Sequence, residues 1–195
     1  IFFQKYSQMS RSQQGLAGAG EWETLRKLLP DFKDKRVLDL GCGYGWHCIY
    51  AMEHGASSVV GVDISHKMLE VAKEKTHFPQ VEYKCCAIED VEFPEESFDV
   101  ILSSLAFHYV ADYEILVKKI YRILKSGGKL VFTVEHPVFT AYGTQDWYYN
   151  EKGEILHFPV DNYYYEGKRT AVFLGEKVTK YHRTLTTYLN TLLSN

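Results

Sequence analysis

Several features that mark other classes of protein are scarce or absent in this sequence of 195 residues. No apolar run approaches the roughly 20 residues that a membrane-spanning helix needs, so we expect no membrane partner. The sequence shows no basic stretch followed by an apolar stretch and a cleavage site, so secretion is not indicated and a cytoplasmic location is expected. A formal net charge of −3 gives no electrostatic reason to expect a nucleic acid as a partner.

Cysteine is also scarce. The four cysteines are Cys42, Cys48, Cys85 and Cys86, and they form no Cys-x-x-Cys pair. Because no second cluster completes a zinc set, we expect no bound metal. Successive residues of a strand point to opposite faces of a sheet, so Cys85 and Cys86 are interpreted as separate, reduced thiols.

What the sequence does contain is a regular alternation of short apolar strands and helices. Strands are predicted over 36–40, 58–62, 81–86, 98–103 and 129–134, and helices are predicted to start near Trp22, Trp46, Ser65 and Asp112. The helix after Asp112 is expected to stop at Gly127-Gly128, and residues 10–20 are expected to form a loop. Such an alternation predicts an α/β fold, in which helices cover both faces of a parallel sheet and a ligand crevice lies at the carboxyl ends of the strands.

The strongest signal is the run from Val37 to Gly45, in which an apolar strand ends in Asp-x-Gly-x-Gly-x-Gly. Glycines at the end of a strand let a ligand approach the backbone closely, and glycine readily adopts the dihedral angles of such a turn. Asp63 ends the next predicted strand, and neighbouring strands lie about 5 Å apart. Its carboxylate can therefore accept hydrogen bonds from both hydroxyls of a ribose held over the glycines.

A nicotinamide dinucleotide site uses similar parts, namely a glycine turn and an acid about 20 residues later. That pattern needs a third glycine where this sequence has Trp46. It also directs a helix N-terminus at a pyrophosphate, which the carboxylate of Asp39 would repel. S-adenosylmethionine carries a sulfonium and an ammonium and no phosphate. The pattern therefore favours S-adenosylmethionine, and a nicotinamide-dependent oxidoreductase is the less favoured alternative.

Four motifs in order resemble those of class I S-adenosylmethionine-dependent methyltransferases: VLDLGCGYGWHCIYA, VVGVDIS, FDVILSSLAFHYV and YRILKSGGKLVFTVEHP. The resemblance covers residues 37–137 and is closest to small bacterial enzymes that act on small molecules. It implies a Rossmann-like, doubly wound sheet with strand order 3-2-1-4-5. It also implies S-adenosylmethionine as the cofactor and S-adenosylhomocysteine as its product.

The resemblance assigns residues to the cofactor. Gly41 and Gly43 would line its methionine end, and Asp63 with Ile64 would hold the ribose and the edge of the adenine. The full set of expected cofactor-binding residues is Asp39, Gly41, Cys42, Gly43, Asp63, Ile64, Met68, Ile88, Glu89 and Ser103. Relatives often carry an Asp after strand three that accepts a hydrogen bond from the adenine, and Ala87 stands at that position here. Ile88 and Glu89 are expected to flank the adenine instead.

Methyl transfer depends mainly on positioning and on exclusion of water, because the sulfonium is already a good leaving group. A base is needed only where the acceptor must lose a proton. His108 and His136, which follow strands four and five, are the expected catalytic residues, and His182 is a further candidate. Residues 103–106 lack the Asn/Asp-Pro-Pro-aromatic tetrad, which argues against methylation of adenine or glutamine amino groups.

Aromatic residues make up 15% of the sequence and concentrate after strand five, where relatives carry a variable cover over the substrate. A hairpin is predicted around Gly175, and Tyr109, Tyr142 and Trp147 are the expected substrate contacts. We expect one domain in four parts. They are an N-terminal helical cover (1–35), a cofactor-binding core (36–135), an aromatic insertion over the open edge of the sheet (136–183) and the start of a C-terminal helix (184–195).

The last expectations concern the end of the sequence and the activity. Relatives continue with strands six and seven, whereas here the helix over 184–193 is followed at once by the final residues. We expect that this strand pair is missing and that strand five is an exposed edge, covered by a second copy of the chain or by further residues. The expected activity is methyl transfer to an unidentified small molecule, aromatic in one interpretation. A cofactor-binding module without transferase activity is the alternative.

Overall fold

The computed structural model describes residues 2–195, and its centre is a five-stranded parallel sheet. The strands are β1 (Arg36–Leu40), β2 (Ser58–Asp63), β3 (Val81–Cys85), β4 (Phe98–Ser104) and β5 (Leu124–Thr133). Their order is β3-β2-β1-β4-β5, which confirms the predicted order. On one side β5 pairs with β4, and no other strand of residues 2–195 pairs with it.

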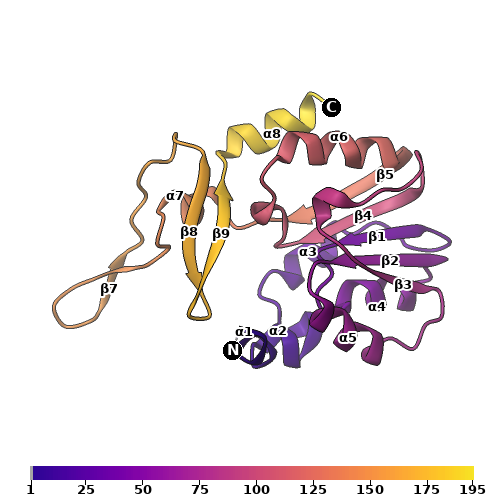
Figure 1. The fold of residues 1–195 in the computed structure, drawn as a ribbon, viewed down its shortest axis with the longest axis horizontal. Helices are drawn as coiled ribbons and strands as arrows, with labels where there is room; N and C mark the ends of the chain where they lie inside the picture. The colour runs from indigo at the N-terminus through magenta and orange to yellow at the C-terminus, as the bar shows by residue number, and fades with distance from the viewer. Residues whose placement is uncertain (1) are drawn as a thin grey trace.

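Helices cover both faces of the sheet, as crossovers between parallel strands require. The helices are α1 (Phe2–Ser7), α2 (Ser10–Gln13), α3 (Trp22–Leu28), α4 (Trp46–Glu53), α5 (His66–Lys75), α6 (Tyr113–Ile123), α7 (Pro137–Ala141) and α8 (Leu185–Leu193). Figure 1 shows α6 and α8 on one side of the sheet and α4 and α5 on the other. None of the helices described is long and apolar enough to cross a membrane.

The alternation of side chains along the strands builds two apolar cores. Leu38 and Leu40 of β1 belong to a cluster with Leu116 and Ile120 of α6, whereas Val37 belongs to a cluster on the other face. That second cluster includes residues of α4 and α5, such as Cys48, Ala51 and Leu69. Because both of their faces are covered, the central strands β1, β2 and β4 are buried at most positions. The sheet is thereby a rigid support for residues at its carboxyl edge.

Two local predictions are corrected. Residues 10–20 are not a loop throughout, since they contain α2 and the 3-10 helix η1 (Gly15–Gly18). Gly15 lies against the ring of Trp46 in α4, so a long-range contact orders a stretch whose composition is typical of loops. The helix α6 ends at Ile123 rather than at Gly127-Gly128, because Leu124 already pairs with Phe98 of β4. The glycines form an irregularity in β5, where Gly127 has a φ of 74°.

The aromatic insertion folds into two small antiparallel sheets. One pairs β6 (Tyr148–Tyr149) with β7 (Ile155–His157), and the other pairs β8 (Gly167–Phe173) with β9 (Glu176–His182). The second is the hairpin predicted around Gly175, which has a φ of 80° in the turn. Figure 1 shows this hairpin beyond the carboxyl ends of β4 and β5 rather than alongside the edge of the sheet.

Candidate active site

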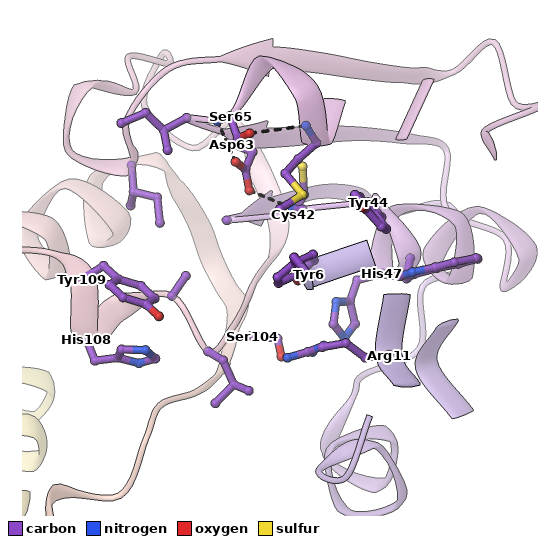
Figure 2. Close-up of a pocket in the computed structure, with 18 of the residues that line it drawn as sticks. Tyr6, Arg11, Cys42, Tyr44, His47, Asp63, Ser65, Ser104, His108 and Tyr109 are labelled. Carbon is purple, nitrogen blue, oxygen red and sulfur yellow. Dashed lines mark hydrogen bonds between the residues drawn. The ribbon is translucent and has the colours of Figure 1, made fainter. Parts of the chain in front are cut away.

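A cavity of about 800 Å³ lies at the carboxyl ends of the strands. This size is typical of small-molecule sites, which range over roughly 300–1,000 Å³. Its walls come from the turn after β1, the end of β2, the 3-10 helices η2 (Ile88–Asp90) and η3 (Phe107–Tyr109), the N-terminal helices and the β8–β9 hairpin. Figure 2 shows His108 and Tyr109 on one side of this cavity and Arg11 and His47 on the other.

The glycine turn after β1 is tied to the neighbouring strand. The backbone N–H groups of Gly41 and Cys42 both donate to the Val62 carbonyl, at 2.8 and 2.9 Å. Gly41 has a φ of +79°, and a Cβ at this position would lie 2.5 Å from the Ala106 Cβ. Gly43 has a φ of +53°, and its nearest neighbour would be the Tyr6 hydroxyl at 3.8 Å. Gly41 is thus required by packing against Ala106, and Gly43 leaves open space at the cavity wall.

Asp63, at the end of β2, faces the cavity with both carboxylate oxygens held in place. Oδ2 accepts the Gly43 N–H at 2.9 Å, and Oδ1 accepts the Ser65 N–H at 2.8 Å. A carboxylate has about four lone-pair sites, so each oxygen can accept one more hydrogen bond. Burial raises the pKa of Asp63, and the bonds from Ser65 and Gly43 oppose that rise.

Most of the residues expected at the cofactor line this cavity. Those that do are Gly41, Cys42, Gly43, Asp63, Ile64, Met68, Ile88 and Glu89. Asp39 and Ser103 do not line it. Ser103 is buried and donates its hydroxyl to the Leu40 carbonyl at 2.8 Å, so it joins β4 to β1 below the cavity.

Asp39 lies beneath the glycine turn, with only 1% of its surface exposed. Its Oδ2 accepts a hydrogen bond from the Cys48 thiol at 3.5 Å, and its Oδ1 has no hydrogen-bond partner among the described residues. Burial raises the pKa of Asp39 to about 7. An orphaned, buried carboxylate oxygen next to a cavity fits a cationic ligand, because a positive charge would offset the cost of burial.

The N-terminal helices contribute cavity residues that the sequence interpretation missed. Tyr6, Met9 and Arg11 line the cavity. The Arg11 guanidinium pairs with Glu21 at 2.8 Å and lies 3.4 Å from the Ser104 hydroxyl at the end of β4. No local motif marks these residues, and only the folding of α1 and α2 over the sheet brings them to the site.

At the end of β4 the chain turns sharply into η3. Leu105 lines the cavity in a left-handed conformation, with a φ of 54°, which costs a non-glycine residue about 1–2 kcal/mol. Its N–H donates to the Thr133 carbonyl at 2.9 Å, which ties the turn to β5. The turn places His108 and Tyr109 in the cavity wall. Burial lowers the pKa of His108 to about 4, so its imidazole is neutral at pH 7.

After β5 the residue that faces the cavity is Glu135 and not the predicted His136. His136 caps α7, and its Nδ1 accepts the Val138 N–H at 3.2 Å. Successive residues of an extended chain point in opposite directions, so the predicted His136 lies outside the cavity wall while its neighbour Glu135 lies in it. The alternation of side-chain directions after β5 does not predict which of these two residues faces the cavity.

The other candidates from the insertion lie elsewhere. His182 is fully buried, with Nδ1 bonded to the Thr140 hydroxyl and Nε2 to the Tyr163 carbonyl, both at 2.8 Å. Both ring nitrogens are therefore engaged in structural contacts. Tyr142 and Trp147 pack against Phe158 and do not line the cavity. The insertion residues that line it are Phe173 and Val178 of the β8–β9 hairpin. Within residues 2–195 no cluster of His, Cys, Asp or Glu side chains is suited to a metal ion.

Comparison with known proteins identifies the family. Residues 38–132 match the model of a methyltransferase domain. A protein from Listeria monocytogenes, assigned to the S-adenosylmethionine-dependent methyltransferases, is 58% identical with a TM-score of 0.86, over 90% of this chain and 82% of that chain. An S-adenosylmethionine-dependent methyltransferase from Mesorhizobium loti is 41% identical with a TM-score of 0.85, over 92% and 82% of the two chains.

A more distant relative carries an assigned reaction. The ubiquinone biosynthesis O-methyltransferase of Coxiella burnetii is 36% identical over 112 residues, which are 56% of this chain and 47% of that protein. The chain thus spans about half the length of this relative. Together with the sheet order and the glycine turn, these matches show that the chain belongs to the class I S-adenosylmethionine-dependent methyltransferases and that its cofactor is S-adenosylmethionine.

Proposed function

We propose that the methyl group is passed to a small molecule bound in the same 800 Å³ cavity, on the side of His108 and Tyr109. The observation that carries this proposal is the division of the cavity. The glycine turn and Asp63 form one part, and η3, Glu135 and the β8–β9 hairpin form another. A transferase needs its two reactants side by side and away from water, and one cavity with two differently built parts meets that need.

The cofactor is proposed to lie across the glycine turn. Asp63 would accept the ribose hydroxyls with its remaining lone pairs, and Ile64, Ile88 and Glu89 would border the adenine. The methionine end would lie near Gly43 and the N-terminal helices, above the orphaned Oδ1 of Asp39. This orientation directs the sulfonium toward Leu105 and η3. When bound, S-adenosylmethionine supplies an electrophilic methyl group at that point.

A substitution of Asp63 tests this placement. Asp63→Asn is expected to weaken binding of S-adenosylhomocysteine by about 1–3 kcal/mol, because a carboxylate that accepts the ribose hydroxyls is lost. Isothermal titration calorimetry measures the change. Asp161→Asn, which alters an exposed acid outside the cavity, is the matched control and should leave the affinity unchanged. Equal affinities for the wild type and the Asp63 variant would remove Asp63 from the cofactor site.

A further inference from the structure

On the proposed acceptor side of the cavity, the carboxylate of Glu135 accepts hydrogen bonds from two residues of the insertion, Lys180 and Gln145. Glu135 Oε1 accepts from the Lys180 ammonium at 2.5 Å, and Oε2 accepts from the Gln145 amide at 2.8 Å. Lys180 also donates to Gln145 Oε1 at 2.8 Å, which closes a ring of three side chains. Glu135 lines the cavity, whereas the Lys180 side chain is only 4% exposed and lies behind it. The ring therefore presents a carboxylate to the cavity with its counter-ion on the far side.

His108 is engaged with the same glutamate through both of its ring nitrogens. Its Nδ1 accepts the backbone N–H of Glu135 at 3.4 Å, which places the imidazole proton on Nε2. Nε2 lies 3.9 Å from Glu135 Oε1. With Nδ1 occupied and Nε2 carrying the proton, the neutral ring has no free lone pair for a substrate proton. His108 is thus a positioning residue: it accepts the backbone N–H of Glu135, and its Nε2 lies near the same carboxylate oxygen that Lys180 binds.

The charged side chains around this part of the cavity are already paired, which indicates that the acceptor is neutral. Lys180 neutralises Glu135, so the pair does not select a cation. Arg11, a cationic side chain that lines the cavity, is paired with Glu21, so its charge is already balanced and does not select a phosphate or a carboxylate. The remaining wall consists of apolar and aromatic groups, including Phe173, Val178 and Tyr109.

We propose that Glu135 binds the hydroxyl group of a neutral acceptor with an aromatic or otherwise apolar body, and that it receives the proton of this hydroxyl during transfer. This inference rests on the proposed function. The hydroxyl donates a hydrogen bond to a remaining lone pair of the Glu135 carboxylate, which directs an oxygen lone pair at the methyl carbon. A bond forms between that oxygen and the methyl carbon, and the carbon–sulfur bond breaks with its electron pair on sulfur. The hydroxyl proton passes to Glu135 and then to solvent.

Glu135 can accept the hydroxyl proton if its side chain is ionised. Burial raises the pKa of Glu135, but the Lys180 ammonium and the Gln145 amide, which donate to its carboxylate, lower it, and the net direction is downward. Glu135 is therefore a carboxylate at neutral pH and a weak base. The hydroxyl becomes far more acidic as its oxygen gains the methyl group, so a weak base that is already hydrogen-bonded can accept the proton.

The first experiment measures ligand binding to the protein loaded with S-adenosylhomocysteine. Catechol is the neutral hydroxylated probe, and veratrole, its dimethyl ether, is the matched probe without hydroxyl groups. Calorimetry is expected to show that catechol binds at least about tenfold more tightly than veratrole, as a hydrogen bond to a charged group provides. The double variant Glu135→Gln/Lys180→Met should lose this preference and keep its affinity for S-adenosylhomocysteine. The double change is used because Glu135→Gln alone leaves a buried, unpaired ammonium.

The inference is overturned by equal binding of the two probes to the wild type, by failure of catechol to bind, or by a catechol preference that survives in the double variant. Tighter binding of phosphoethanolamine than of catechol would also contradict the inference, because it would show that the site prefers a charged acceptor. Asp146→Asn, an exposed acid-to-amide change in the same insertion, should behave as the wild type. If S-adenosylhomocysteine does not bind at all, the proposed function fails; if it binds and the other results are negative, only this inference fails.

A second experiment tests the role of His108 without any ligand. Nitrogen-15 chemical shifts of the imidazole report which ring nitrogen carries the proton. We expect the Nε2-protonated form in the free protein, and no titration of His108 between pH 6 and 8. A ring protonated on Nδ1, with Nε2 free to accept, would make His108 the base and would overturn the assignment to Glu135.

Discussion

At the scale of single residues, Asp39 is a buried carboxylate whose ionisation is opposed by burial. It lies beneath the glycine turn, and one of its oxygens has no partner among the residues described. Its folded-state pKa of about 7 exceeds the ordinary value of 3.8 because burial disfavours the charged form. The folded protein therefore holds a proton that the unfolded chain releases between these two values. Stability contributed by that proton is present below pH 4 and is lost as the pH rises toward 7.

Replacing the carboxyl group by an amide should remove this loss. We expect Asp39→Asn to raise the free energy of unfolding relative to wild type, and the gain should be about 2–3 kcal/mol larger at pH 8 than at pH 5. Urea denaturation of the ligand-free protein at both pH values measures the difference. The same gain at both pH values would mean that Asp39 ionises in the folded protein without penalty.

At the scale of elements, the aromatic insertion has two parts with different positions. The β8–β9 hairpin reaches the cavity through Phe173 and Val178 and supplies Lys180 to Glu135. The β6–β7 ribbon does not line the cavity, and its side chains are exposed on both strands. A tight turn shapes its tip, where the Asn150 side chain accepts the backbone N–H groups of Lys152 and Glu154. Only the hairpin is therefore expected to contribute to ligand binding.

Shortening the ribbon tests this division. Replacing residues 149–156 by an Asn-Gly turn, which favours a two-residue hairpin, should leave the affinity for S-adenosylhomocysteine and catechol within about twofold. Phe173→Ala in the hairpin should weaken catechol binding by about 1–3 kcal/mol, because apolar contact area is lost from the acceptor wall. Calorimetry on both variants compares the effects. A loss of catechol binding in the shortened variant, with Phe173→Ala unaffected, would reverse the roles of the two parts.

At the scale of the whole molecule, the cavity is assembled from residues that span the chain from Tyr6 to Val178. The N-terminal helices, the carboxyl ends of the strands and the hairpin meet there, and an unfolded chain has no such site. A ligand of this cavity therefore binds only the folded protein and must stabilise it by mass action.

Thermal unfolding with the cofactor measures this linkage. S-adenosylhomocysteine at 100 times its dissociation constant should add about 2.7 kcal/mol to the free energy of unfolding. For a domain of this size the melting temperature should rise by about 5–11 °C. NAD at the same concentration should produce no shift, because Trp46 stands where a dinucleotide-binding turn needs its third glycine. A comparable shift with NAD would contradict the cofactor assignment.

Local patterns in the sequence were sufficient to predict the sheet and the part of the cavity wall that the glycine turn and Asp63 form. The apolar strands, the glycine turn and Asp63 each depend on a few neighbouring residues, through side-chain alternation and through backbone angles that glycine favours. The strand order followed from the family resemblance and is confirmed. Local patterns also indicated His108, because the residues after β4 lie at the carboxyl edge of the sheet.

Only the tertiary structure decided which residues after β5 and from the N-terminal helices line the cavity. The sequence predicted His136 rather than Glu135, because the direction of a side chain beyond the end of a strand depends on where the chain next turns. Asp39 was expected to line the cofactor site, but the packing of α4 buries it with Cys48 outside the cavity wall. Arg11 and Lys180 reach the site through contacts with Ser104 and Glu135, 93 and 45 residues away in the sequence. Such contacts leave no periodicity or spacing in the sequence, because they form only when separate elements pack together.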